Sequence, residues 1–190
     1  MVAYFSQAHW ATRDRLIPAG FMAFAAYLGV LTYFFSPSGP AIVDGAVPIS
    51  DFLCFWLAGG EVMHGRPGVV YDNSAFLALQ TPYLEAGAFY PFFYPPTFLL
   101  LVAPLGMMAA IPAYAVSQAV SLALAGAACA RILRNWTGFL LIAAMPASFN
   151  AMFHGQNALL CAALLGGGLA ALGGRRQILE GILLGQLHIK

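Results

Sequence analysis

The sequence has 190 residues, of which 61% are hydrophobic and only 8% are charged, and its mean hydropathy is +0.80. Soluble domains carry about 25% charged residues, so this composition excludes an ordinary soluble domain and predicts a membrane protein. A net charge of +1, without a run of lysines or arginines, excludes a nucleic-acid-binding surface. The cysteines are odd in number and form no CxxC pair, so we expect neither a disulfide nor a cysteine metal site.

The first apolar segment runs from Ile17 to Phe35, directly after Arg13 and Arg15. It is longer than the roughly 7–15 apolar residues of a signal peptide, and no clear small-residue cleavage site closes it. We therefore expect an uncleaved first helix, in which Pro18 is tolerated near the start.

A polar loop rich in Pro and Gly follows, over residues 36–96. Ser50 is a suitable N-cap for a helix from Asp51 to about Met63, and a second short helix is expected over residues 74–84. The loop holds five of the seven acidic residues: Asp44, Asp51, Glu61, Asp72 and Glu85.

The rest of the chain consists of apolar segments. Residues 97–111 form a short segment interrupted by Pro104 and Gly106, which either crosses the membrane or forms a re-entrant or interfacial pair of half-helices. Cleaner helices are expected over residues 113–133, 137–153 and 158–172, with a last one from residue 178 onward. The predicted fold class is all-α: a polytopic membrane helix bundle of about five spans, in a single membrane domain over residues 1–190 that we expect to be truncated.

Charge decides how the segment 97–111 is interpreted. If it does not cross the membrane, six arginines share one side: Arg13, Arg15, Arg131, Arg134, Arg175 and Arg176. Lys and Arg concentrate in short cytoplasmic loops, so this arrangement is favoured and the N-terminus is predicted to be cytoplasmic. The loop 36–96 and the turn 154–157 then share the extracytoplasmic side.

Asp51 is the first candidate for chemistry. It stands at the predicted start of a helix among Phe52, Phe55 and Trp56, and a helix N-terminus stabilises a carboxylate by roughly 0.3–1 kcal/mol. A carboxylate at the membrane surface can act as general base toward a sugar hydroxyl. The residue alone also fits, and rather favours, a helix-terminal charge without a catalytic role.

Four further loop residues are candidates for substrate binding, each with a plainer alternative. Arg66 suits a phosphate or a solvated turn, and Tyr71-Asp72 suits sugar hydroxyls or the cap of the helix that starts near Ser74. Tyr94, followed by two prolines, suits a binding residue or a rigid extended connection to the next helix.

The turn His154-Gly155-Gln156-Asn157 places three hydrogen-bonding side chains between two apolar segments. Polar residues at membrane depth are costly and often functional, although a turn between two spans needs polar residues in any case. A single histidine without nearby Cys or carboxylate residues does not predict a metal site.

The order of these motifs resembles a known family. The residues that carry the resemblance are Asp51-Phe52, Trp56-x-Ala58-Gly59, Gly65, Tyr71-Asp72, Tyr94-Pro95-Pro96, Pro104-Leu105, Gly155-Gln156-Asn157 and Gly181-x-x-Leu184-Gly185 running to Lys190. The pattern is similar to family 87 of the glycosyltransferases, the polyprenyl-phosphate-mannose-dependent α-mannosyltransferases with the GT-C membrane fold. It covers most of the chain from Asp51 onward and matches the N-terminal half of such enzymes.

The resemblance implies that Asp51 is the catalytic base, which deprotonates an acceptor hydroxyl that then attacks the anomeric carbon with inversion. It implies as partners a polyprenyl-phosphate sugar donor, mannose being the expected sugar, a glycolipid or glycan acceptor, and the bilayer of the inner (plasma) membrane. Arg66, Tyr71, Asp72, Tyr94, His154, Gln156 and Asn157 are the expected substrate-binding residues. No nucleotide-binding domain, cofactor or metal is expected.

Two other function classes compete with this one. A transporter or flippase-like protein would carry ionisable residues within its helices, where this sequence has only Glu180 and Lys190 near a span. A non-catalytic membrane scaffold would not need Asp, Tyr and the His-Gly-Gln-Asn turn on one face.

Overall fold

The computed structural model describes residues 12–36, 50–84 and 87–173, together with residues 183 and 185. Within these residues all regular secondary structure is helical and no strand occurs, which confirms the all-α class. The elements are α2 (Arg13–Phe34), α3 (Ser50–Met63), the 3-10 helix η1 (Pro67–Tyr71), α4 (Asn73–Gln80), α5 (Pro96–Val102), the 3-10 helix η2 (Ala103–Met107), α6 (Ala110–Leu133), α7 (Thr137–Ala144), α8 (Pro146–Phe153) and α9 (Ala158–Gly173). The helix expected from residue 178 falls almost entirely outside the described residues.

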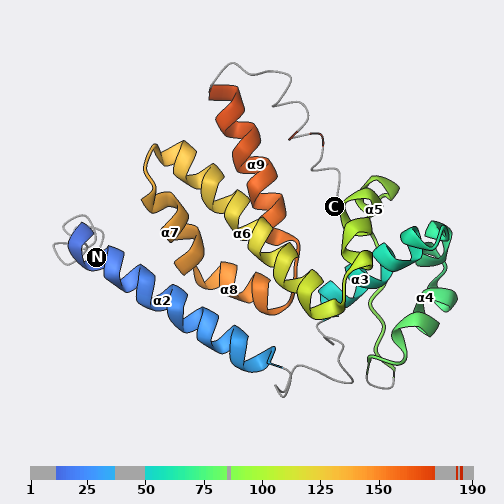
Figure 1. The fold of residues 1–190 in the computed structure, drawn as a ribbon. Coiled ribbons are helices and arrows are strands. Elements are labelled where there is room, and N and C mark those ends of the chain that lie inside the picture. The colour runs from blue at the N-terminus through green and yellow to red at the C-terminus, as the bar shows by residue number, and fades with distance from the viewer. Residues whose placement is uncertain (1–11, 37–49, 85–86, 174–182, 184, 186–190) are drawn as a thin grey trace, which may run out of the picture.

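The helices form two groups (Figure 1). In the first, α6 packs against both α7 and α9, and α2 packs against α7. In the second, α3, α4 and α5 gather with η1 and η2 near the end where α6 begins. Phe52 of α3 joins the groups, because its ring meets the ring of Tyr114 in α6 edge to face, with centroids 5.4 Å apart.

Aromatic contacts show which helix ends lie together. At one end of the bundle, Phe35 after α2 contacts Tyr114 near the start of α6 at 4.7 Å and Phe153 at the end of α8 at 6.2 Å between ring centroids. At the other end, Phe21 of α2 lies 6.5 Å from Trp136, just before α7. α2 therefore runs in the same direction as α7, on which it packs, and in the opposite direction to α6.

This arrangement separates the turn 154–157 from the arginines that follow α6. Gly155 packs against Phe52 of α3, at the end where α6 begins. Arg131 and Arg134 lie at the other end, where Arg13 shares a surface pocket with Leu133. The turn 154–157 therefore lies with α3 at one end of the first group, and these arginines lie at the other end. The charge pattern predicted the same separation.

Two helices are long and apolar enough to cross a membrane by length and composition. They are α2, with 22 residues, and α6, with 24 residues. At 1.5 Å per residue both exceed the roughly 30 Å of a hydrocarbon core. The remaining described helices are shorter, so the five spans expected from the sequence are not confirmed.

The segment 137–153, expected to be one helix, is divided into α7 and α8. Pro146 pushes the preceding residue out of the helical region, and Met145 accordingly has an extended backbone with ψ of 129°. Proline is well suited to the first turn of a helix, so α8 starts at Pro146.

The segment 97–111 does not form one long helix. The seven residues of α5 and the five of η2 span about 20 Å together, given rises of about 1.5 and 2.0 Å per residue. They pack on α3, where a Cβ atom at Gly59 would lie only 2.9 Å from the backbone nitrogen of Gly106. Trp56 of α3 also holds this segment on α3, since its Nε1 donates a hydrogen bond of 2.9 Å to the carbonyl of Met108.

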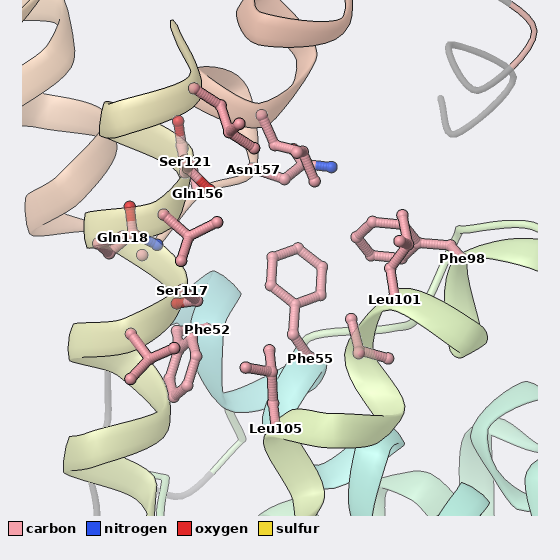
Figure 2. Close-up of a pocket in the computed structure, with 16 residues that line it drawn as sticks. Phe52, Phe55, Phe98, Leu101, Leu105, Ser117, Gln118, Ser121, Gln156 and Asn157 are labelled. Atoms are coloured by element: carbon pink, nitrogen blue, oxygen red, sulfur yellow. The ribbon is translucent and has the colours of Figure 1, made fainter. Parts of the chain in front are cut away.

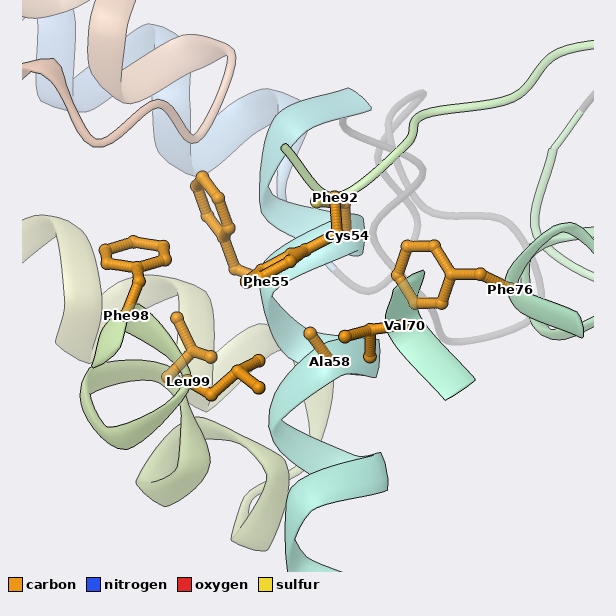
Figure 3. Packing of buried hydrophobic residues seen from close by; sticks show 9 residues of the cluster. Cys54, Phe55, Ala58, Val70, Phe76, Phe92, Phe98 and Leu99 are labelled. Atoms are coloured by element: carbon orange, nitrogen blue, oxygen red, sulfur yellow. The ribbon is translucent and has the colours of Figure 1, made fainter. Parts of the chain in front are cut away.

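The second group has its own hydrophobic core, in which α3 is the central element (Figure 3). Phe76 of α4 and Val70 of η1 pack on one side of α3, and Phe98 and Leu99 of α5 on another. The full cluster is Cys54, Phe55, Ala58, Val70, Phe76, Phe92, Phe98, Leu99 and Val102. This core holds α3 in place, and the first turn of α3 meets α6 and the turn 154–157 through Phe52.

Candidate functional site

Asp51 lies in the first turn of α3 and is partly exposed. It lines a pocket of about 330 Å³, called here the Asp51 pocket. The other residues of this pocket are Cys54, Phe55, Tyr90, Pro91, Phe93 and Tyr94. The structure thus brings two of the predicted site residues, Asp51 and Tyr94, to one concave surface.

Two side chains hold the extended segment 90–94 against this pocket. Gln80, which is fully buried, donates from Nε2 to the carbonyl of Tyr90 at 2.8 Å and accepts from the Tyr90 amide at 2.9 Å. Tyr71 donates from its hydroxyl to the carbonyl of Tyr94 at 2.9 Å. Tyr71 therefore supports the pocket wall through the backbone of Tyr94.

The ring of Tyr94 is fixed by its neighbours. It stacks on Phe98 with centroids 4.6 Å apart and meets Phe55 edge to face at 5.2 Å. Burial, followed by the proximity of Cys54, Asp51 and Cys161, raises the pKa of Tyr94 to about 12. The phenol therefore keeps its proton at neutral pH and can act as a hydrogen-bond donor.

The Cys54 thiol, like the Tyr94 phenol, keeps its proton at neutral pH. Burial, with a smaller contribution from Asp51, raises the pKa of its thiol to about 12, so the thiol is not a nucleophile at neutral pH. Asp51 is the one carboxylate among the residues that line the pocket. It is thus the group best suited to accept a proton there.

A second pocket of about 290 Å³ lies between α6, the start of α9, and α3 with α5 and η2. It is called here the amide pocket, and Phe55 lines both pockets. Its lining residues are Phe52, Phe55, Phe98, Leu101, Val102, Leu105, Val116, Ser117, Gln118, Val120, Ser121, Leu124, Gly155, Gln156, Asn157 and Leu160. Figure 2 shows polar side chains on the side of α6 and α9, facing the rings of Phe55 and Phe98 with Leu101 and Leu105.

Gln156 and Asn157 were expected in a site, but Ser117, Gln118 and Ser121 of α6 were missed by the sequence analysis. Their signal was available: Ser121 lies four residues after Ser117 and three after Gln118, spacings that place side chains on the same side of a helix, here within an apolar segment that is a candidate span. Polar residues in such a segment commonly mark a functional interior.

Gly155 sets the distance between the turn and α3. Its backbone has φ of +64°, and a Cβ atom there would overlap the Cβ of Phe52. Glycine adopts this conformation without the steric cost that other residues incur. The close approach leaves Gln156 and Asn157 facing the amide pocket.

The remaining predicted site residues line neither pocket. Arg66 donates to the buried Glu61 in an ion pair of 3.0 Å, and Asp72 is the exposed N-cap of α4. His154 is exposed, with its ring edge to face against Phe153 at 5.5 Å between centroids. For Asp72 the structure shows the capping role that the sequence left open beside sugar binding.

The cap is made by one oxygen of Asp72. Its Oδ1 accepts from the Ser74 hydroxyl at 2.6 Å and from the amides of Ser74 and Ala75 at 2.9 and 3.1 Å. These three bonds, the hydroxyl first, lower the pKa of Asp72. Within the described residues, no group of three or more His, Cys, Asp or Glu is placed to hold a metal ion.

Comparison with known proteins gave one match. The model of a family described as Glycosyltransferase family 87 matches residues 92–190, which is 99 of the 190 residues. No curated protein matches the chain, and no solved structure matches it. Tyr94, His154, Gln156 and Asn157 lie inside the matched segment, whereas Asp51, Arg66, Tyr71 and Asp72 precede it.

Proposed function

The chain belongs to glycosyltransferase family 87, and we propose that it forms the N-terminal part of an enzyme that transfers mannose from a polyprenyl-phosphate donor to an acceptor hydroxyl. Family membership makes the protein a glycosyltransferase, and together with α2 and α6 it indicates a membrane protein. The lipid-linked donor, the glycolipid or glycan acceptor, the GT-C type of bundle with about five spans and the location in the inner membrane are parts of the proposal.

The proposed chemistry takes place at the Asp51 pocket. The acceptor oxygen attacks the anomeric carbon from the side opposite the phosphate, so that a new carbon–oxygen bond forms as the bond to polyprenyl phosphate breaks. The configuration is inverted, the phosphate leaves with its electron pair, and the acceptor proton passes to Asp51. Removing that proton as the bond forms is general base catalysis.

The observation that supports this role is the position of Asp51. It is the one carboxylate in a pocket whose other walls are aromatic and apolar, and it lies in the first turn of α3. The neighbouring Tyr94 and Cys54 remain protonated at neutral pH because their pKa values are raised to about 12. Neither of them competes with Asp51 as the base.

The decisive experiment is Asp51→Asn in the complete enzyme, reconstituted in lipid and assayed with polyprenyl-phosphate mannose. Asparagine keeps the size of the side chain but cannot accept the acceptor proton. Positioned proton transfer contributes about 10²–10⁴-fold to rate, so kcat is expected to fall by about that factor. The thermal unfolding midpoint is expected to stay close to that of the unmodified protein.

Asp72→Asn is the matched control, because it makes the same chemical change at a carboxylate that lines neither pocket and Asn caps helices about as well as Asp. It is expected to leave kcat within a few-fold of the unmodified enzyme. Near-normal turnover by Asp51→Asn would remove this residue from the mechanism.

A further inference from the structure

Two side-chain amides that line the amide pocket each have one buried atom without a hydrogen-bond partner among the described residues. Gln118 is 5% exposed, and its Oε1 has no partner. The Nδ2 atom of Asn157 is also buried without a partner. A buried polar group that is left unpaired destabilises the protein, so a ligand that can pair with these two atoms is expected.

The chemistry of these atoms specifies the missing group. A carbonyl-type oxygen needs a donor, and an amide nitrogen needs an acceptor. A hydroxyl group supplies both, and it does so whichever way round each amide is placed. A ligand with a hydroxyl head can thus complete the polar wall.

The pocket does not suit a charged head. None of the residues that line it, all within the described part of the chain, is Asp, Glu, Lys, Arg or His. Bringing a phosphate or carboxylate into such a site would remove its hydration without a compensating charge. An uncharged head therefore fits this pocket better than a charged one.

The other walls suit an apolar chain. Val116, Val120 and Leu124 line the pocket at successive turns of α6 and are 45%, 51% and 49% exposed. Residues four apart share one helix face, so these three form an apolar stripe along a candidate membrane span. The pocket itself, at about 290 Å³, holds about ten groups of the size of a water molecule, which is enough for a head and a short length of chain.

We propose that the amide pocket binds an uncharged lipid with a hydroxyl head, which pairs with Gln118 and Asn157 while its chain lies along the stripe of Val116, Val120 and Leu124. Asp51 does not line this pocket. The bound hydroxyl is thus not the one that reacts in the proposed transfer. The inference stands without the proposed role of Asp51.

The proposal is tested with three probes that share one oleyl chain. They are oleyl alcohol, its methyl ether, which can accept but not donate a hydrogen bond, and oleyl phosphate, which is charged. The full chain is held in nanodiscs, and binding of a photoreactive, tritiated oleyl alcohol is measured in competition with each probe. Mass spectrometry of the cross-linked peptides then locates the lipid.

Oleyl alcohol is expected to compete about tenfold better than the methyl ether, because the ether leaves a buried acceptor unpaired. Oleyl phosphate is expected to compete more weakly still. Cross-links are expected in peptides that contain residues 116–124. Equal competition by all three probes, or cross-links confined to other helices, would overturn the proposal without any variant being made.

Gln118→Leu tests the polar wall directly. It replaces the unpaired amide by an apolar side chain of similar size, so the protein without ligand should unfold at an equal or higher temperature, while affinity for oleyl alcohol falls about tenfold. Asn150→Leu removes an exposed amide on α8 and should leave the affinity unchanged. Unchanged affinity in folded Gln118→Leu would contradict the role of Gln118 and overturn the proposal.

Discussion

The backbones of Gly59 and Gly106 are in direct contact where α3 crosses η2. A Cβ atom added at Gly59 would lie 2.9 Å from the backbone nitrogen of Gly106, and one added at Gly106 would overlap the backbone of Gly59. Only two glycines allow main chains to approach this closely. The crossing fixes α5 and η2 on α3, and with them the ring of Phe98 that lines the amide pocket.

Gly59→Ala is therefore expected to destabilise the protein, whereas the neighbouring Gly60→Ala is not. Overpacking costs about 1–3 kcal/mol, and here the added methyl meets backbone atoms that cannot turn aside. Nothing lies within 4 Å of a Cβ atom at Gly60, so alanine there should stabilise α3 by roughly 0.5–1 kcal/mol. Thermal unfolding of both variants in the same detergent measures the difference, and equal midpoints would show that the crossing is looser than described.

Gly155→Ala is expected to cost more stability than Gly65→Ala. Both glycines have positive φ, +64° and +72°, so alanine incurs roughly 1–2 kcal/mol of backbone strain at either position. Only at Gly155 does the new methyl also overlap Phe52. The difference between the thermal unfolding midpoints of the two variants measures the contact between the turn 154–157 and α3. A smaller loss of stability in Gly155→Ala than in Gly65→Ala would argue against that contact.

The cap made by Asp72 predicts a specific pH dependence. Hydrogen bonds from the Ser74 hydroxyl and then the Ala75 and Ser74 amides lower the pKa of Asp72 below its ordinary value of 3.8. The stabilisation is therefore fully present above pH 3.8 and is lost as the pH falls through the lowered pKa of the folded state. Asp72→Ala should unfold at a lower temperature than the unmodified protein at pH 7. This gap between the two unfolding midpoints should narrow below pH 3.8. A gap that stays constant across this range would mean that the ionised carboxylate is not what caps α4.

The ends of the bundle can be assigned to the sides of the membrane by labelling. In a background without Cys54, Cys129 and Cys161, the exposed positions are tested as Asn73→Cys, His154→Cys and Asn135→Cys. A membrane-impermeant thiol reagent added to intact cells should label the first two positions and not the third, which lies between α6 and α7 at the opposite end. Labelling of the Asn135 position from outside, without the other two, would reverse the proposed orientation.

Local signals account for much of what the sequence predicted correctly. Ser50 and Asp51 at the start of α3, Asp72 before α4 and the end of α6 near Leu133 were all expected within a few residues of where the structure has them. Caps and prolines act within about one turn of the chain, so they can be recognised without knowing the fold. The division of residues 137–153 into two helices was not predicted. Pro146 indicates a helix boundary, but the apolar pattern continues on both sides of it.

Local signals did not predict how the two pockets are assembled. Tyr94 was predicted from its own segment, but its contact with Phe55 and its place opposite Asp51 depend on the packing of segments some 40 residues apart. Arg66 looked available for a phosphate in the sequence, whereas in the structure it pairs with Glu61.

Composition determined that the protein is apolar, and the length and spacing of the apolar segments determined that it is helical, because both act locally along the chain. Only the tertiary structure decided which polar residues are buried together. Gln118 lies 39 positions before Asn157, and no local pattern relates them. They line one pocket because α6 packs along α9 and Gly155 permits the turn to approach Phe52, and that close approach is a property of long-range packing.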